Sequence, residues 1–323
     1  MGIIILFSIG IKLIMFVKNA FTPPPPPTAT FGKLPPIAFP TQTKESLTYT
    51  INTLTGYLPV FPDRAKIYRI IINPPTLLGL NNTGAEVAKV GFTSPGTQIS
   101  EDTYQWTSQD DIQRKITMNI YSSNFKLSSS YLSAKTLGTF SGTDEANDAI
   151  KTVKSFLSKM SLLPSDIDES KTQIAPYSIE AGALVPAKNI TRAKIVKVDF
   201  FQNDIDKLPI YYEKGTSSTF DFLVGKNVEQ QVLEATFIHR NISNISSTYA
   251  IKTAQEAYSE LQNGNAYIAN KDNDVVGFTI KNVYLGYYVG EADQNFLMPV
   301  IVFQGSNNFL AYVSAVRDEW IGN

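Results

Sequence analysis

The chain contains a single histidine, His239, and this residue is its one candidate for an imidazole base. A hydrolase of the triad type needs such a base beside a hydroxyl nucleophile. His239 follows the apolar segment 232–238, which has the composition of a strand, and no nucleophile-elbow motif accompanies it. We therefore interpret His239 as a strand-end or surface histidine. One histidine also excludes metal sites that need two or three of them, and the absence of cysteine excludes thiol catalysis, disulfides and cysteine-ligated metals.

Residues 272–274 (Asp-Asn-Asp) with Gly277 have the spacing that opens a calcium-binding loop. An EF-hand would need a ligand at the position of Val276 and a bidentate glutamate at the position of Val283. Neither valine can supply one. We interpret this segment as a polar hairpin loop.

Asp204 and Asp206 are spaced closely enough to be considered as a pair of carboxylates for acid–base work. They precede Lys207-Leu208-Pro209, a sequence typical of a loop, and no further acid stands beside them. A solvated turn is the better interpretation. The sequence thus predicts no catalytic residue, no metal and no cofactor.

Aromatic side chains are concentrated near the C-terminus. They allow two interpretations: tyrosines can line a groove for a peptide or a glycan, or they can fill a core, which alternation within strands favours for most of them. We keep five as a candidate interaction surface: Tyr284, Tyr287, Tyr288, Phe309 and Tyr312.

Three helices are predicted to position these residues. The clearest covers 144–162, where apolar residues recur at spacings of three and four. Two shorter helices are predicted from capping boxes, in which a threonine hydroxyl caps the third amide and a glutamate reaches back. These boxes are Thr83 with Glu86 and Thr253 with Glu256.

Strands are predicted between and after the helices, because branched and aromatic residues alternate with polar ones. They cover residues 47–51, 116–120, 195–201, 278–289, 298–304 and 310–316. Helix starts at Thr83, Thr143 and Thr253 are each followed by strands. This order predicts an α+β fold built from tandem units of a helix and an antiparallel sheet.

The N-terminal region has a different character, with an apolar run over residues 2–17 followed by the five prolines 23–27. A cleaved signal peptide, a buried core helix and an uncleaved signal anchor are the three alternatives, and the anchor fits best because a proline run acts as a spacer. Lys12 and Lys18 taken alone would place the following domain in the cytoplasm. We expect an anchor at 1–21, a proline-rich stalk at 22–42, an N-terminal α+β domain at 43–141 and a C-terminal α+β domain at 142–323.

Composition narrows the class of partner. A net charge of -1 and a pI near 6.0 provide no electrostatic footprint for nucleic acid. With 43% hydrophobic residues, the chain can form one large or two ordinary cores.

Apolar, aromatic and turn residues recur in a particular order through the C-terminal part of the chain. They lie at 249–253, 256–257, 261–264, 283–288, 297–300 and 311–313. This order resembles the C-terminal region of YycH/YycI-type proteins. Upstream, residues 85–92 with 104–106, and residues 199–201 with 208–210, resemble the helix-then-strands units of that group and of PepSY-like domains.

The resemblance implies a single-pass bacterial membrane protein whose extracytoplasmic module is not an enzyme and regulates an envelope sensor kinase through protein contacts. We therefore expect a membrane-tethered, non-catalytic regulatory or interaction module, held to the membrane by the N-terminal helix and bound to a protein of the envelope. The alternative is a module that binds cell-wall peptide or glycan through the aromatic strands.

Overall fold

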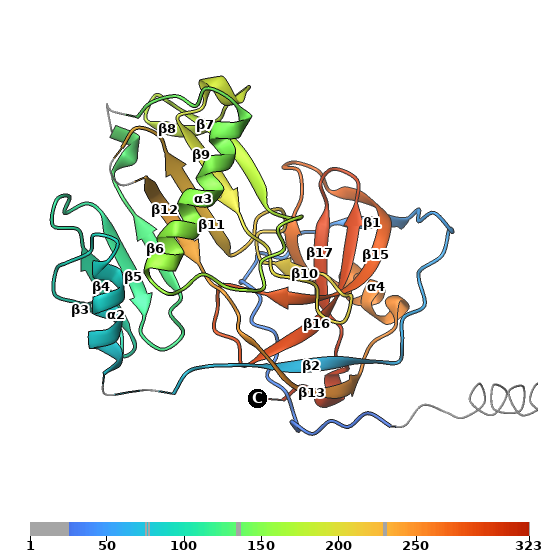
Figure 1. Cartoon of the computed structure of the whole chain (residues 1–323). Helices are drawn as coiled ribbons and strands as arrows, with labels where there is room; N and C mark the ends of the chain where they lie inside the picture. The colour runs from blue at the N-terminus through green and yellow to red at the C-terminus, as the bar shows by residue number, and fades with distance from the viewer. Residues whose placement is uncertain (1–25, 75, 77, 134–136, 229–230, 323) are drawn as a thin grey trace, which may run out of the picture.

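The computed structural model describes residues 26–74, 76, 78–133, 137–228 and 231–322. Within these residues the structure is mixed and mostly sheet, with three α-helices. The strands form a nine-stranded and an eight-stranded sheet, which lie beside one another (Figure 1). We call each sheet, together with the helices that cover it, the first lobe and the second lobe respectively.

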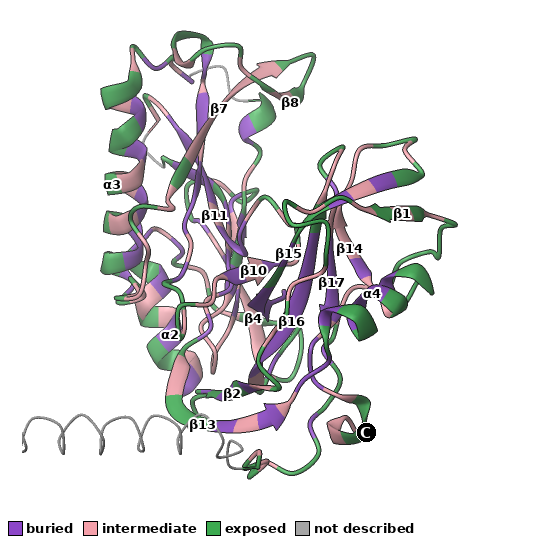
Figure 2. Ribbon diagram, turned by 90° about the vertical axis from the view of Figure 1, so that its right-hand side faces the viewer, coloured by how far each residue is buried: buried purple, intermediate pink, exposed green. Residues whose placement is uncertain are grey.

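The first lobe contains the nine-stranded sheet, in the order β3-β4-β5-β6-β12-β11-β9-β7-β8, with neighbouring strands antiparallel. Its two helices pack apolar side chains on the same core cluster as the sheet, and the inner side of α3 is buried while its outer side is exposed (Figure 2). The elements are β3 (Thr97–Gln98), β4 (Thr103–Thr107), β5 (Lys115–Asn119), β6 (Phe125–Ser128), β7 (Gln173–Glu180), β8 (Ala183–Pro186), β9 (Ile195–Asp199), β11 (Phe220–Gly225), β12 (Val232–Phe237), α2 (Gly79–Ala88) and α3 (Thr143–Lys159).

The second lobe is organised around the long strand β15. On one side β15 pairs antiparallel with β16, and it also pairs in parallel with β1 and β10, so the sheet is mixed rather than purely antiparallel. The elements are β1 (Thr48–Ile51), β2 (Arg64–Ile70), β10 (Ile210–Tyr212), β13 (Ile242–Ala250), β14 (Tyr267–Asn270), β15 (Gly277–Val289), β16 (Phe296–Gly305), β17 (Leu310–Ser314) and α4 (Ala254–Gln262). Short 3-10 helices lie in connections, at η1 (Tyr131–Ser133), η2 (Ile190–Arg192) and η3 (Asp318–Trp320).

The helix predictions are confirmed at α3 and α4. Thr253 and Glu256 form the reciprocal capping box at the start of α4. The predicted box at Thr83 is wrong, because α2 already begins at Gly79 and Thr83 is buried within it. Gly79, Thr83 and Val87 follow one another at the four-residue spacing that places side chains on one helix face, so Thr83 faces the core and does not cap.

The six predicted strands are present as β1, β5, β9, β15, β16 and β17. Asn307 and Asn308 adopt left-handed backbone angles, with φ of 55° and 56°, in the turn that joins β16 to β17. Asparagine tolerates this conformation better than most residues. Strands β15, β16 and β17 pair antiparallel in chain order, so the antiparallel arrangement predicted after the third helix is confirmed for them.

The predicted boundary at residues 141 and 142 does not separate the two sheets. Strands β3 to β6 precede it and β7 to β12 follow it, yet both groups join one sheet through the pairing of β6 with β12, where Leu127 lies opposite Ala235. The second sheet likewise combines β1 and β2 with strands after residue 209. Pairing between distant segments determines which strands belong to which sheet. Helix and strand periodicity does not encode this pairing.

Most of the predicted stalk is packed against the second lobe. Residues 22–25 lie outside the described residues, but residues 28–39, which we call the strap, are in contact with the sheet. Leu34 is fully buried and its amide donates to the Trp320 carbonyl at 2.8 Å. Phe39 stacks on Tyr267 with ring centroids 5.3 Å apart. The stalk prediction is thus wrong for residues 28–39, because the strap carries apolar side chains and their removal from water stabilises the folded state.

The strap and α4 cover opposite faces of the second sheet. Leu34 and Ile37 pack with Tyr288 and Tyr312 in one cluster, whereas α4 packs with Phe303 and Phe309 in another.

No helix within the described residues is long and apolar enough to cross a membrane. The predicted anchor at 1–21 lies outside those residues.

The α4 contacts predict a graded response to mutation. Thr253→Ala removes one capped amide and should lower the free energy of unfolding by about 1 kcal/mol. Tyr258→Ala should lower it by about 3–5 kcal/mol, because this ring is buried against Phe303 and its hydroxyl donates to the Tyr49 carbonyl at 3.0 Å. Urea unfolding gives both values. Ser259→Ala, at an exposed position of α4, is the control and should change little. Equal losses for Thr253→Ala and Tyr258→Ala would contradict this packing.

Candidate functional site

The predicted aromatic surface is not a surface. Tyr287, Tyr288, Phe309 and Tyr312 are all buried, and of the five candidate residues only Tyr284 is exposed, at 41%. The prediction is wrong for the other four because both faces of the second sheet are covered. The four buried side chains belong to three core clusters, and of the five candidates only Tyr284 reaches water.

The buried tyrosines have structural partners. The Tyr287 hydroxyl donates to the Lys66 carbonyl, and the Tyr312 hydroxyl donates to the Tyr212 carbonyl, each at 3.0 Å. Burial raises the pKa of both hydroxyls, so they stay protonated and act as donors. These rings connect strands and are not available to a ligand.

The acidic segments also have structural roles. The loop at 272–274 joins β14 to β15, which pair with different strands, so it is a connecting loop and not a hairpin. Asp272 accepts a hydrogen bond from Asn308 at 2.7 Å. Asp206 accepts from Tyr68 at 2.5 Å, whereas Asp204 pairs with Lys171. The two carboxylates thus have separate partners in a turn, as predicted. In the described part of the chain, no three acidic, histidine or cysteine side chains gather as metal ligands.

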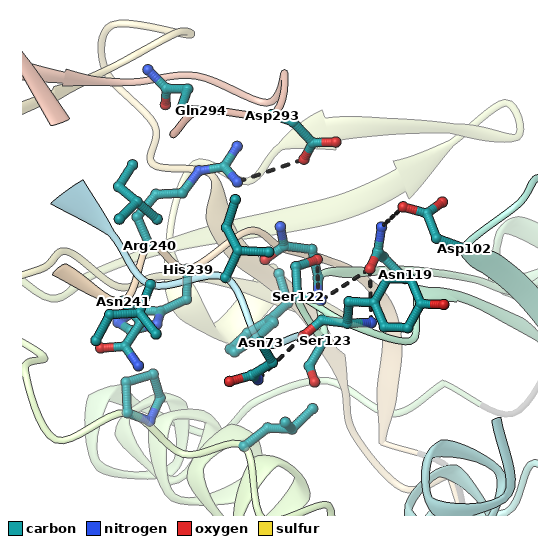
Figure 3. A pocket seen from close by; sticks show the side chains of 18 of the residues that line it. Asn73, Asp102, Asn119, Ser122, Ser123, His239, Arg240, Asn241, Asp293 and Gln294 are labelled. Atoms are coloured by element: carbon teal, nitrogen blue, oxygen red, sulfur yellow. Dashed lines mark hydrogen bonds and ion pairs between the residues drawn. The ribbon is translucent and has the colours of Figure 1, made fainter. Parts of the chain in front are cut away.

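A polar hollow of about 430 Å³ lies where residues of both lobes meet, and we call it the interlobe groove. Its walls come from the residues after β2, the β5–β6 turn, the end of α3, the residues after β12 and the loop between β15 and β16 (Figure 3). The side chains labelled in Figure 3 are all polar: Asn73, Asp102, Asn119, Ser122, Ser123, His239, Arg240, Asn241, Asp293 and Gln294.

His239 lines this groove and is half-buried. It follows β12, so its predicted place at a strand end is confirmed. Its Nε2 lies 2.7 Å from Asp166 Oδ1, and its ring stacks on Phe237 with centroids 6.3 Å apart. The carboxylate and the ring therefore fix the orientation of the imidazole.

Asp166 is held by a second donor. Gln202 Nε2 donates to its other oxygen at 2.8 Å and also to the Arg240 carbonyl at 2.9 Å. Burial alone would raise the pKa of Asp166, but the hydrogen bonds from His239 and Gln202 outweigh it and hold the pKa below its usual value. Asp166 is accordingly a carboxylate at neutral pH, and it accepts from the His239 N–H.

Arg240 extends from the groove wall into the second lobe. Its side chain is buried, and Nη2 donates to the carbonyls of Gly290, at 3.0 Å, and Ala292, at 2.5 Å. The exposed carboxylate of Asp293 lies 3.8 Å from Nη1 (Figure 3). Arg240 thus fastens the residues after β12 to the β15–β16 loop, which gives the groove a fixed wall.

The opposite wall is the β5–β6 turn, which Asn119 stabilises. Its Oδ1 accepts from the backbone amides of Tyr121 and Ser122, both at 2.9 Å, and its Nδ2 donates to Asp102 at 2.6 Å. Asn73 donates to the Tyr121 carbonyl from the second lobe at 3.2 Å. Both walls are therefore preformed by hydrogen bonds.

Several polar groups of the groove have no protein partner. The Asn124 Oδ1 atom is buried and accepts no hydrogen bond from the described residues. The side chains of Asn241 and Asn295 are exposed and likewise form none within the described chain. A buried unpartnered oxygen is costly unless water or a ligand satisfies it. The groove thus offers both a donor and an acceptor function to a polar guest.

An apolar hollow of about 480 Å³ adjoins the groove and shares Ile70, Ile71, Ile72 and Asn295 with it. Three exposed isoleucines mark this side, Ile71 at 47%, Ile72 at 51% and Ile245 at 61%, and we call them the isoleucine rim. Exposed branched side chains grouped beside a polar hollow are typical of an interaction site.

Sequence analysis singled out His239 but missed the rest of this site. Asp166 and His239 are distant in the chain, and only the pairing of strands brings them together. The local signals were His239 and Arg240, which directly follow the apolar segment 232–238. The groove has the polar groups to bind a ligand. Within the described residues, however, no hydroxyl forms a hydrogen bond with His239 and could serve as the nucleophile of a triad.

The Asp166 hydrogen bonds predict a pH-dependent contribution to stability. Because the folded-state pKa is lowered, the contribution is present above the unfolded-state pKa of about 3.9 and is lost as pH falls through the folded-state value. Asp166→Asn should therefore lower the free energy of unfolding by about 1–3 kcal/mol at pH 7, with the difference shrinking toward pH 3. Urea unfolding over this pH range measures it. Glu101→Gln, at an exposed position, is the control. A difference that stays constant from pH 7 to pH 3 would contradict the assignment.

No model of a protein family matches the chain, and no curated protein matches it. Solved structures with some likeness include an uncharacterized protein from Eubacterium rectale, with 12% identity, a TM-score of 0.41 and coverage of 83% of this chain and 89% of that one. Another is the C-terminal domain of YpeB from Bacillus megaterium, with 10% identity, a TM-score of 0.32 and coverage of 76% and 94%. These TM-scores are too low to assign the chain to the fold family of either protein.

Proposed function

We propose that this chain is a non-catalytic interaction module that binds an extended segment of a protein partner along the interlobe groove and the isoleucine rim. The observation that carries the proposal is the continuity of the two surfaces, which share the residues at the end of β2. The unpartnered amides of Asn241 and Asn295 suit the alternating donors and acceptors of an extended backbone. The rim suits apolar side chains of the same segment.

The alternative was a glycan- or peptide-binding surface on the aromatic strands. Four of its five candidate residues are buried and cannot contact a ligand. Among the described residues that line the groove, one phenylalanine is buried, Phe237, and one tyrosine is half-buried, Tyr121. Exposed branched aliphatic side chains favour a polypeptide over a sugar, since sugars stack on open aromatic faces. We therefore place the partner among proteins.

We further propose that the module has no enzymatic activity. His239 is engaged by Asp166 and stacked on Phe237, an arrangement that positions the ring as part of the groove wall. His239→Ala should then leave the fold intact and weaken partner binding at most modestly.

The remaining elements of the proposal come from the sequence. The apolar run at 2–17 and the prolines after it support a single-pass anchor in the cytoplasmic membrane with the module on the extracytoplasmic side. The order of a helix followed by antiparallel strands, seen at α2, α3 and α4, accords with the resemblance to YycH/YycI-type and PepSY-like proteins. A regulatory role in the envelope follows from that resemblance.

The absence of cysteine allows a direct test in intact cells, because any introduced cysteine is unique. Ile72→Cys places a thiol on the rim, and Val276→Cys, also exposed at 62%, places one before β15 as the matched control. A membrane-impermeant maleimide should label both positions if the module is extracytoplasmic. A maleimide-linked photo-crosslinker should then join Ile72→Cys, but not Val276→Cys, to one discrete protein.

The two parts of this experiment fail independently. Labelling that requires lysis of the cells would contradict the location alone. Labelling at both positions with identical crosslinked products would contradict the assignment of the groove and rim as the binding surface.

A further inference from the structure

A third hollow, of about 360 Å³, lies on the helix-covered side of the first lobe. It is bounded by the second half of α3, by Val90 after α2, by Arg114 before β5 and by Gln231 and Val232 at the start of β12. We call it the arginine pocket. It shares no residue with the interlobe groove.

Arg114 is the unusual feature of this pocket, because it is 3% exposed and has few partners. Nη2 donates to the Val232 carbonyl at 3.2 Å and Nη1 to the Val90 carbonyl at 3.5 Å, while Nε has no partner among the described residues. The guanidinium lies 4.4 Å from the centre of the Phe92 ring. It is thus held by an aromatic face and two long hydrogen bonds.

No carboxylate within the described residues forms an ion pair with Arg114. Asp111 acts on it only at longer range, and burial lowers the pKa of the guanidinium to about 10. Arg240 provides a contrast, since that buried guanidinium has backbone carbonyls at close range and Asp293 nearby. A buried cation is costly unless it is paired. Both buried arginines donate to backbone carbonyls and have an unpartnered Nε, but within the described residues Arg114 is the one without a carboxylate at ion-pair distance.

The mouth of the pocket adds positive charge and hydroxyls. Lys151, Ser155 and Lys159 follow one another at four-residue spacing on α3, which places them on one face of the helix. Lys151 pairs with Asp148 at 2.8 Å, and Lys159 has no ion-pair partner among the described residues. The described residues that line the pocket include three cations and no carboxylate.

We propose that the arginine pocket binds a phosphate group, either as the free ion or as a phosphate monoester of a small organic molecule. A guanidinium offers paired N–H donors that match phosphate oxygens, and Arg114 is already fixed in position by Phe92. Lys159 and the Ser155 hydroxyl, at the mouth, would meet the outer oxygens. The volume leaves room for a small organic group beside the phosphate.

The test is titration calorimetry of the full chain with inorganic phosphate and with glycerol 3-phosphate, at constant ionic strength. Both probes should bind saturably, and tighter binding of glycerol 3-phosphate would identify the organic monoester as the better ligand. The double variant Lys151→Gln/Lys159→Gln should bind about tenfold more weakly. Its matched control is Lys188→Gln/Lys281→Gln, which removes the same charge at exposed positions away from the pocket.

Arg114→Met provides the second test. It keeps a long side chain but replaces the charged guanidinium with an apolar group, so it should abolish phosphate binding without lowering the thermal unfolding temperature of the ligand-free protein. An absence of saturable binding to the unmutated chain would overturn the proposal. Equal weakening in the two double lysine variants would also overturn it, because it would show only general charge attraction.

Discussion

The burial of both faces of the eight-stranded sheet is the constraint on which the second lobe depends. One face is covered by α4, and the other by the strap at 28–39, which supplies Leu34 and Ile37 to the cluster around Tyr288 and Tyr312. A sheet that is covered twice needs apolar residues at successive positions, and β16 is buried at almost every one of them. The strap, which has no helix or strand periodicity, thus covers the face of the sheet that a second helix would otherwise cover.

The interlobe groove depends on the same arrangement. The strap hydrogen-bonds to β13, where the Ala29 amide donates to the Thr248 carbonyl at 3.0 Å. Strand β13 pairs with β2, with Ile242 opposite Ile70, and the residues that flank this pair form one wall of the groove and the isoleucine rim. Arg240 then ties this wall to the β15–β16 loop. Strap, strands and groove are therefore linked by a short series of contacts.

Local patterns predicted the elements well and their partners poorly. The 144–162 periodicity and the Thr253 box identified α3 and α4 because both depend on residues within one or two turns. The capping box predicted at Thr83 was wrong because a threonine can either cap a helix or face a core, and Thr83 is buried within α2. The strap was missed because it directly follows the prolines 23–27 and was interpreted with them as a spacer, although Phe31, Leu34, Ile37 and Phe39 were visible there. The Asp166–His239 pair and the isolation of Arg114 depend on long-range pairing, for which a single sequence offers no signal.

The most direct test of the account compares two fragments that end at Asn323, one beginning at Pro26 and the other at Thr43. Removal of the strap exposes the Tyr288 and Tyr312 face of the sheet, so the shorter fragment should lose about 3 kcal/mol or more in free energy of unfolding. It should also bind the dye ANS, which reports exposed apolar surface. Urea unfolding of both fragments measures the difference. Equal midpoints and equal dye binding would contradict the claim that the strap completes the second core.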